Sequence, residues 1–281
     1  MDSTLEAIRP ASDRPFPRGW LVPVGVGRWL LLGTALLQAV TPGLIPFDGS
    51  AEEPPVVPAG YAFSIWSVII AGCLVAALAG LPQRQAASPA YRAVHVRLSV
   101  VQLLLVAWLL AATSSVVWMT VPIFVAMLAL TLVSLRRVLS AGRGVAPDAS
   151  ARPGRWGRDR LALGLLTAIL GVYAGWSTAG VWINMASLLA QAGISPDGHA
   201  GTAWQSAFLI GACVVAVLAI RVLAAPLPYV AAVAWAFVGV VVSAVVAEAP
   251  GLATVAVLGL IVVAAATLTT RHHLVVHAGT P

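Results

Sequence analysis

Residues 171–191 read GVYAGWSTAGVWINMASLLAQ, a stretch that is long and apolar enough to cross a membrane as a helix. Aromatic and polar side chains nevertheless recur in it every three or four residues, which places them on one helical face. This face carries Tyr173, Trp176, Gly180, Asn184, Ser187 and Gln191. Lipid accepts an amide poorly, and Asn184 is the only asparagine in the chain. We therefore expect the face to point into a helical bundle.

The composition of the whole chain indicates the class of protein. Of its 281 residues, 60% are hydrophobic and 9% are charged, whereas a soluble domain carries about 25% charged residues. So much apolar surface requires a lipid environment, where helices satisfy the backbone hydrogen bonds internally. The sequence therefore predicts an all-α, polytopic transmembrane helical bundle.

The basic residues of the chain serve as topology signals in this interpretation. The net charge is +6, and all sixteen Lys and Arg residues are arginine. Because the arginines lie between the hydrophobic stretches, a nucleic-acid surface is not expected. A bias toward Ala, Val and Arg without Lys is typical of a GC-rich bacterial genome, so we expect the protein in the bacterial inner (plasma) membrane.

Eight stretches have the length of about 20 residues that a membrane-spanning helix needs. They are 20–41, 59–80, 97–114, 116–135, 161–190, 202–223, 228–247 and 251–270. With eight spans, every arginine falls on one side of the membrane, and the positive-inside rule places both termini in the cytoplasm. The first outer connection carries Asp48, Glu52 and Glu53 and no arginine.

The spans lack the residues that most membrane enzymes and metal sites need. No Asp, Glu or His lies within a span, and Cys73 and Cys213 are interpreted as core thiols. We therefore expect no metal site and no catalytic residue, and an enzyme is disfavoured. An enzyme that stabilises a carbocation with aromatic faces stays open as an alternative.

Three different spans place an aromatic or amide side chain at a similar depth. Trp66, Trp108 and Asn184 each lie about six or seven residues, roughly 10 Å, from the outer end of their span. One interpretation is helix packing, in which Asn184 bonds a neighbouring helix and Gly180 permits close approach. The other is an apolar pocket with aromatic walls and a few polar groups that orient a flat ligand.

At these residues the sequence resembles the tryptophan-rich sensory protein family, also called the translocator family. The second span begins PAGYAFSIWSVI (residues 58–69), the fifth contains GWSTAGVWIN (175–184), and a weaker match is QLLLVAW (102–108). The chain departs from the family pattern at Gly180, where an alanine is usual, and at Leu105, where an asparagine is often found. Members usually have five helices, whereas this chain adds about three.

The resemblance implies a five-helix bundle around a ligand pocket. The ligands expected from it are tetrapyrroles, such as haem or protoporphyrin, and sterol or isoprenoid lipids. The residues expected to bind the ligand are Tyr61, Phe63, Trp66, Trp108, Tyr173, Trp176, Ala179, Gly180 and Asn184. A sensor or carrier is the leading function, and an enzyme acting on an isoprenoid or porphyrin in the aromatic cavity is the alternative.

The expected organisation follows from the spans and the resemblance. Residues 1–19 form a cytoplasmic N-terminal tail, and 20–191 form the family-like bundle with a flexible, Arg-rich cytoplasmic loop at 136–160. Residues 192–270 form the additional transmembrane helices, and 271–281 a cytoplasmic C-terminal tail. The expected partners are the lipid bilayer and a small hydrophobic ligand, with homodimer formation left open.

Overall fold

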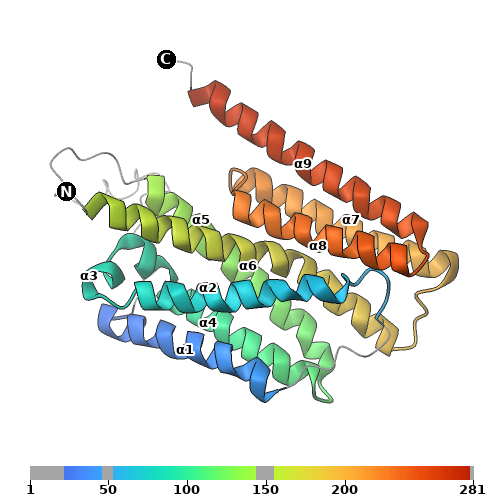
Figure 1. The fold of residues 1–281 in the computed structure, drawn as a ribbon, viewed down its shortest axis with the longest axis horizontal. Helices are drawn as coiled ribbons and strands as arrows, with labels where there is room; N and C mark the ends of the chain where they lie inside the picture. Colours follow the sequence, from blue (N-terminus) through green and yellow to red (C-terminus); the bar gives the residue numbers. More distant parts are fainter. Residues whose placement is uncertain (1–21, 46–52, 144–154, 279–281) are drawn as a thin grey trace, which may run out of the picture.

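The computed structural model describes residues 22–45, 53–143 and 155–278, and all regular structure in these ranges is helical (Figure 1). The elements are α1 (Val24–Leu44), the 3₁₀ turn η4 (Gly60–Ser64), α2 (Ile65–Ala79), α3 (Gln83–Ala86), α4 (Pro89–Ala112), the 3₁₀ turn η5 (Val117–Met119), α5 (Thr120–Arg143), α6 (Arg155–Gln191), α7 (Gly198–Val222), α8 (Leu227–Val246) and α9 (Pro250–Ala278). Eight of the described helical segments are long and apolar enough to cross a membrane. The protein is therefore a polytopic helical membrane bundle.

Several helix boundaries differ from those expected from hydropathy. Helix α4 begins at Pro89 and not near 97, because Ser88 caps its first turn by accepting a hydrogen bond from the Tyr91 amide. Helices α5 and α6 extend into the expected loop 136–160, so only 144–154 lie outside the described residues. Charged residues such as arginine continue a helix well, although they lower its hydropathy.

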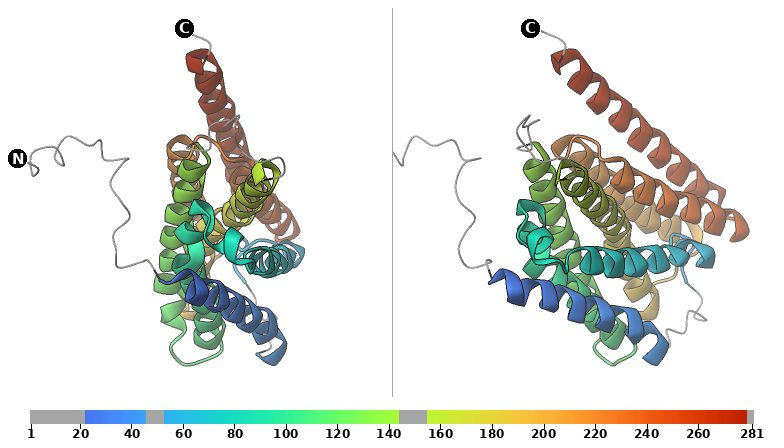
Figure 2. Two further views of the ribbon diagram at one scale, coloured as in Figure 1. Left: turned by 90° about the vertical axis from the view of Figure 1, so that its left-hand side faces the viewer. Right: turned by 60° about the vertical axis from the view of Figure 1, so that its left-hand side comes forward.

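The structure describes only one of the two segments expected as tails. The N-terminal tail 1–19 lies outside the described residues. Helix α9, by contrast, continues to Ala278, well into the segment expected as the C-terminal tail. Figures 1 and 2 show the C-terminal end of α9 extending beyond its neighbours α7 and α8.

Five helices form a ring. Helix α1 contacts α4, α4 contacts α5, α5 contacts α6, and α2 closes the ring by contacting both α6 and α1. The contact between α2 and α6 brings together the two spans that carry the main sequence motifs, residues 58–69 and 175–184. Between α1 and α4, the hydroxyl of Thr34 donates to the amide oxygen of the buried Gln102. Such interhelical hydrogen bonds hold membrane helices together where burial in lipid supplies little driving force.

Helices α7, α8 and α9 form a second group that packs on the ring through α6. Glycines on α6 permit this approach, because a Cβ atom on Gly175 would overlap the backbone of Tyr229 on α8. The hydroxyls of Thr178 and Tyr229 are hydrogen-bonded at 2.9 Å across the same interface. Helix α6 runs without interruption from Arg155 to Gln191, and glycines such as Gly171 and Gly175 serve its close packing against α8.

The two ends of the bundle differ in charge. We call the end that holds residues 53–60, 113–116, 192–197 and 247–249 the loop end, and the opposite end the arginine end. The arginines whose side chains are described gather near the arginine end: Arg28, Arg84, Arg92, Arg97, Arg136, Arg137, Arg160, Arg221 and Arg271. Among the described residues, the loop end carries the carboxylates of Glu53, Asp197 and Glu248 and no arginine.

Candidate functional site

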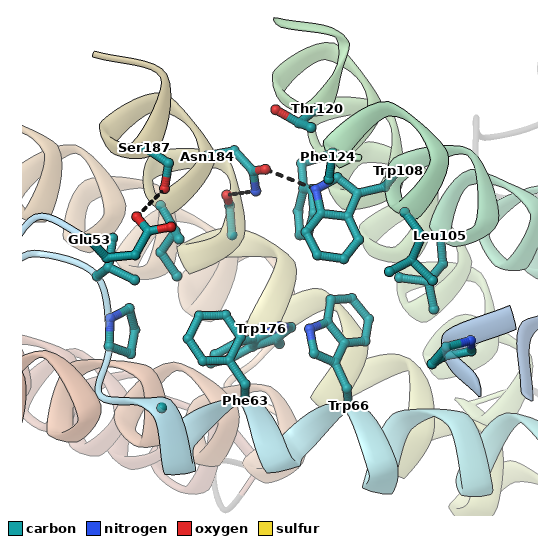
Figure 3. Close-up of a pocket in the computed structure, with 18 of the residues that line it drawn as sticks. Glu53, Phe63, Trp66, Leu105, Trp108, Thr120, Phe124, Trp176, Asn184 and Ser187 are labelled. Carbon is teal, nitrogen blue, oxygen red and sulfur yellow. Dashed lines mark hydrogen bonds between the residues drawn. The ribbon is translucent and has the colours of Figure 1, made fainter. Parts of the chain in front are cut away.

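A cavity of about 790 Å³ lies in the loop-end half of the five-helix ring (Figure 3). Every helix of the ring lines it: Pro42 comes from α1, Trp66 from α2, Leu105 and Trp108 from α4, Phe124 from α5, and Trp176 from α6. Its size lies within the range of about 300–1,000 Å³ found for small-molecule sites. The cavity is thus large enough for an organic ligand.

Aromatic rings form the main wall of this cavity, with Trp66 at their centre. The indole of Trp66 stacks on Trp108 at a centroid distance of 6.1 Å and an interplanar angle of 23°. Four further ring contacts are edge-on: Trp66 with Phe124 (6.2 Å), Trp66 with Tyr173 (5.8 Å), Trp66 with Trp176 (6.3 Å) and Phe63 with Trp176 (5.5 Å). Edge-to-face pairs at these distances are attractive and hold the rings in defined orientations.

The amide of Asn184 links the aromatic wall to α6. The indole nitrogen of Trp108 donates to Asn184 Oδ1 at 2.9 Å, and Asn184 Nδ2 donates to the Gly180 carbonyl oxygen at 2.7 Å. Asn184 therefore bonds a neighbouring helix and lines the cavity at the same time. The sequence left open whether Asn184 holds two helices together or lines a ligand pocket. The two interpretations are compatible, because one amide has enough donors and acceptors for both.

The connection before η4 crosses the cavity at the loop end and is anchored to α7 and α8. Residues 57–60 line the cavity. Three hydrogen bonds make the anchor: Val56 N to Gln205 Oε1 (3.0 Å), Ala59 N to Gly239 O (3.0 Å) and Trp235 Nε1 to Ala62 O (2.9 Å). We call residues 53–60 the mouth loop. The second group of helices thus positions one wall of a cavity that is otherwise built by the ring.

Glu53 stands at the start of the mouth loop and is the one ionisable side chain among the described residues that line the cavity. Its Oε2 atom accepts a hydrogen bond of 2.7 Å from the Ser187 hydroxyl on α6. Figure 3 shows the carboxylate on the side of the cavity next to Ser187, with the aromatic rings of Trp66 and Trp108 opposite. The mouth loop is therefore tied to α6 as well as to α7 and α8.

The structure brings together six of the nine residues that the sequence nominated for the site. Those that line the cavity are Phe63, Trp66, Trp108, Trp176, Gly180 and Asn184. Tyr61 lies outside it, 46% exposed, with its ring edge-on to Trp235 at 5.5 Å. Tyr173 is fully buried behind Trp66 and Ala179 is half-buried, and neither lines the cavity. The inward face of α6 extends over more helical turns than the cavity does. Tyr173 therefore lies on this face but does not line the cavity.

Phe124 and Glu53 are among the lining residues that were not nominated from the sequence. Phe124 on α5 packs edge-on to Trp108 at 5.5 Å, and it lies against α6 where a Cβ atom on Gly180 would overlap its ring. Phe124 lies a few residues from the loop end of α5, at a depth that matches Trp66, so the depth argument could have identified it but was not applied to this span. Glu53 was expected, with Asp48 and Glu52, in an outer connection that could cover the cavity, but no local pattern indicates that its carboxylate reaches the lining.

The lining residues suit the flat body of a tetrapyrrole but offer no ligand for its iron. Haem iron is held by His, Cys, Met or Tyr side chains, and none of these types is found among the described residues that line the cavity. No group of three or more His, Cys, Asp or Glu side chains in the described ranges is arranged to hold a metal ion. A porphyrin would therefore be held through its faces and substituents.

Comparison with known proteins identifies one family. The family model described as TSPO-like protein matches residues 50–269. The match begins in the connection before the mouth loop and ends within α9, so it includes α7, α8 and most of α9 as well as the aromatic residues of the cavity. No curated protein and no solved structure matches the chain.

Proposed function

Because this chain belongs to the TSPO-like protein family, we propose that it is a membrane sensor or carrier that binds a flat, largely apolar ligand in the aromatic cavity. A tetrapyrrole and a sterol or isoprenoid lipid are the ligand classes considered. The observation that carries the proposal is the convergence of Phe63, Trp66, Trp108, Phe124 and Trp176 on one cavity. Aromatic faces bind flat molecules with a large contact area and little loss of side-chain entropy.

Replacing Trp66 by alanine is expected to weaken ligand binding about tenfold, because the ring that faces the cavity centre contributes about 1–1.5 kcal/mol of stacking. Purified protein would be titrated with protoporphyrin, haem, a carotenoid and a sterol while its tryptophan fluorescence is recorded. The tightest-binding member of the panel would then be compared between wild type and Trp66→Ala.

Trp29→Ala provides the matched control for this experiment. Trp29 is also a tryptophan of the bundle, but it is 58% exposed on α1 and does not line the cavity. Its replacement is expected to leave the affinity unchanged. Equal affinities in Trp66→Ala and wild type for every ligand that binds would contradict the proposed site.

The second candidate function is a membrane enzyme that acts on an isoprenoid or porphyrin, and the observation that favours it is the Glu53 carboxylate on the cavity lining. A positioned carboxylate can act as a general acid or base. Incubation of the protein with each bound compound, followed by chemical analysis, separates the two functions. Binding predicts that the compound is recovered unchanged, whereas catalysis predicts a product whose formation stops in Glu53→Gln.

We further propose that the arginine end, with both termini, faces the cytoplasm of a plasma membrane. The support is the separation of the described arginines from the loop end, since arginines are enriched in cytoplasmic connections. Reporter fusions at positions 50, 147, 196 and the C-terminus are expected to read outside, inside, outside and inside. A C-terminal reporter on the outer side would overturn this orientation.

A further inference from the structure

The charge of the cavity is set by Glu53. In the described lining, Glu53 is the one side chain that ionises, and no Arg or His accompanies it. Its Oε2 atom is bonded to Ser187, while Oε1 makes no hydrogen bond to any described residue. A carboxylate with a free oxygen favours a donor or a positive charge on the ligand. The same carboxylate repels an anion.

The described residues at the loop end carry charges of the same sign as Glu53. Asp197 and Glu248 add carboxylates at the loop end, and the described arginines lie at the other end of the bundle. The whole chain contains no lysine. A cleft bordered by charges of one sign concentrates ions of the opposite sign. The entrance to the cavity is therefore suited to cations.

The aromatic wall also attracts positive charge. The faces of Trp66, Trp108 and Trp176 carry negative π density, which attracts a cation placed over the ring. Aromatic cages of this kind bind ammonium groups in many proteins. An apolar wall alone would suit any flat molecule, but the combination with one carboxylate and no basic group discriminates by charge.

We propose that the cavity selects a ligand with a flat apolar body and a positively charged nitrogen, for which Glu53 is the counter-ion. This inference rests on the proposed ligand-binding function and narrows its substrate class to organic cations. The apolar body lies against the wall formed by Trp66 and Trp108, and the charged nitrogen lies toward Glu53 and Ser187. Haem and protoporphyrin, which carry two carboxylates, are expected to bind more weakly than their neutral esters.

The test uses three anthracene probes with one ring system and different charge: (9-anthrylmethyl)trimethylammonium, 9-anthracenemethanol and 9-anthracenecarboxylate. Binding is measured in a neutral detergent by energy transfer from tryptophan to anthracene. The wild type is expected to bind the cation about tenfold more tightly than the alcohol, and the carboxylate most weakly. This preference is expected to decrease at high salt, since Glu53 is exposed at the entrance.

Glu53→Gln removes the charge while keeping the size of the side chain. It is expected to reduce affinity for the cation about tenfold, to leave the alcohol unchanged and to improve binding of the carboxylate. Glu248→Gln is the matched control, because Glu248 is an exposed carboxylate at the same end that does not line this cavity. Ser187→Ala removes the tether but keeps the charge, so it is expected to retain the cation preference.

The outcomes separate the two proposals. A cation preference that is lost in Glu53→Gln and retained in Glu248→Gln supports the inference. Equal binding of the three probes in wild type, or a preference that survives Glu53→Gln, overturns the inference while the proposed function stands, provided that Trp66→Ala weakens all three probes. If Trp66→Ala changes none of the affinities, the proposed function itself is overturned.

Discussion

Trp176→Ala is expected to lower the free energy of unfolding by about 2–4 kcal/mol, the largest effect of any single change considered for this protein. Trp176 is 1% exposed, and its ring packs edge-to-face with Phe63 and Trp66 at centroid distances of 5.5 Å and 6.3 Å. Truncation leaves a void between α2 and α6 that the rigid helices cannot close. In a membrane the transfer of apolar surface contributes little, so the loss comes from packing contacts, and the estimate lies below that for a soluble core.

The measurement is unfolding of the purified protein in mixed micelles, followed by tryptophan fluorescence and circular dichroism. Trp118→Ala is the control, because Trp118 is 59% exposed near the hairpin between α4 and α5. It is expected to change the stability by less than about 0.5 kcal/mol. A Trp176→Ala protein as stable as the control would mean that the aromatic cluster does not hold α2 against α6.

Gln205→Leu is expected to destabilise the protein by about 1–3 kcal/mol and to release the mouth loop. Gln205 on α7 is 2% exposed, and its side chain accepts from Val56 N and donates to the carbonyl oxygens of Pro196 and Gly201. Leucine keeps the volume but leaves the buried Val56 amide without its partner. The energetic cost of that unpaired group is the reason for the effect.

Amide hydrogen exchange measures the release of the mouth loop directly. The amides of Val56, Val57 and residues 59–62 are expected to exchange faster in Gln205→Leu, while those of α4 and α5 keep their protection. Ligand dissociation is expected to become faster as well, because the mouth loop forms one wall of the cavity. Gln83→Leu on α3 is the control, since Gln83 is exposed at the arginine end. Unchanged exchange across 54–62 would mean that α7 does not position the loop.

The result for Gln205 bears on the role of the three C-terminal helices. They do not enclose the cavity, and α8 contributes only Ser243 to its lining. They instead hold the mouth loop through Gln205 and through the backbone of Gly239. The family match extends through these helices. The described contacts indicate that the mouth loop, with Glu53, depends on the second group of helices for its position.

The sequence alone determined the properties that depend on local pattern. Hydropathy was sufficient to predict eight membrane spans. The spacing of three and four residues between polar and aromatic side chains was sufficient to predict which face of α6 points inward. The placement of Trp66, Trp108 and Asn184 at one depth also followed, because helical rise converts residue number into distance. Boundaries such as the start of α4 at Pro89 did not follow, since hydropathy does not detect polar helical turns beyond the membrane.

Only the tertiary structure decided which side chains face a common space. Trp176 and Trp66 both line the cavity, yet Trp176 is 1% exposed whereas Trp66 is only half-buried at the centre of the aromatic wall. Glu53 reaches Ser187 across 134 residues, and Val56 reaches Gln205 across 149. Contacts at such separations depend on how the helices pack in three dimensions. No local pattern of residues encodes them, because the propensities and periodicities of a sequence act only over a few helical turns.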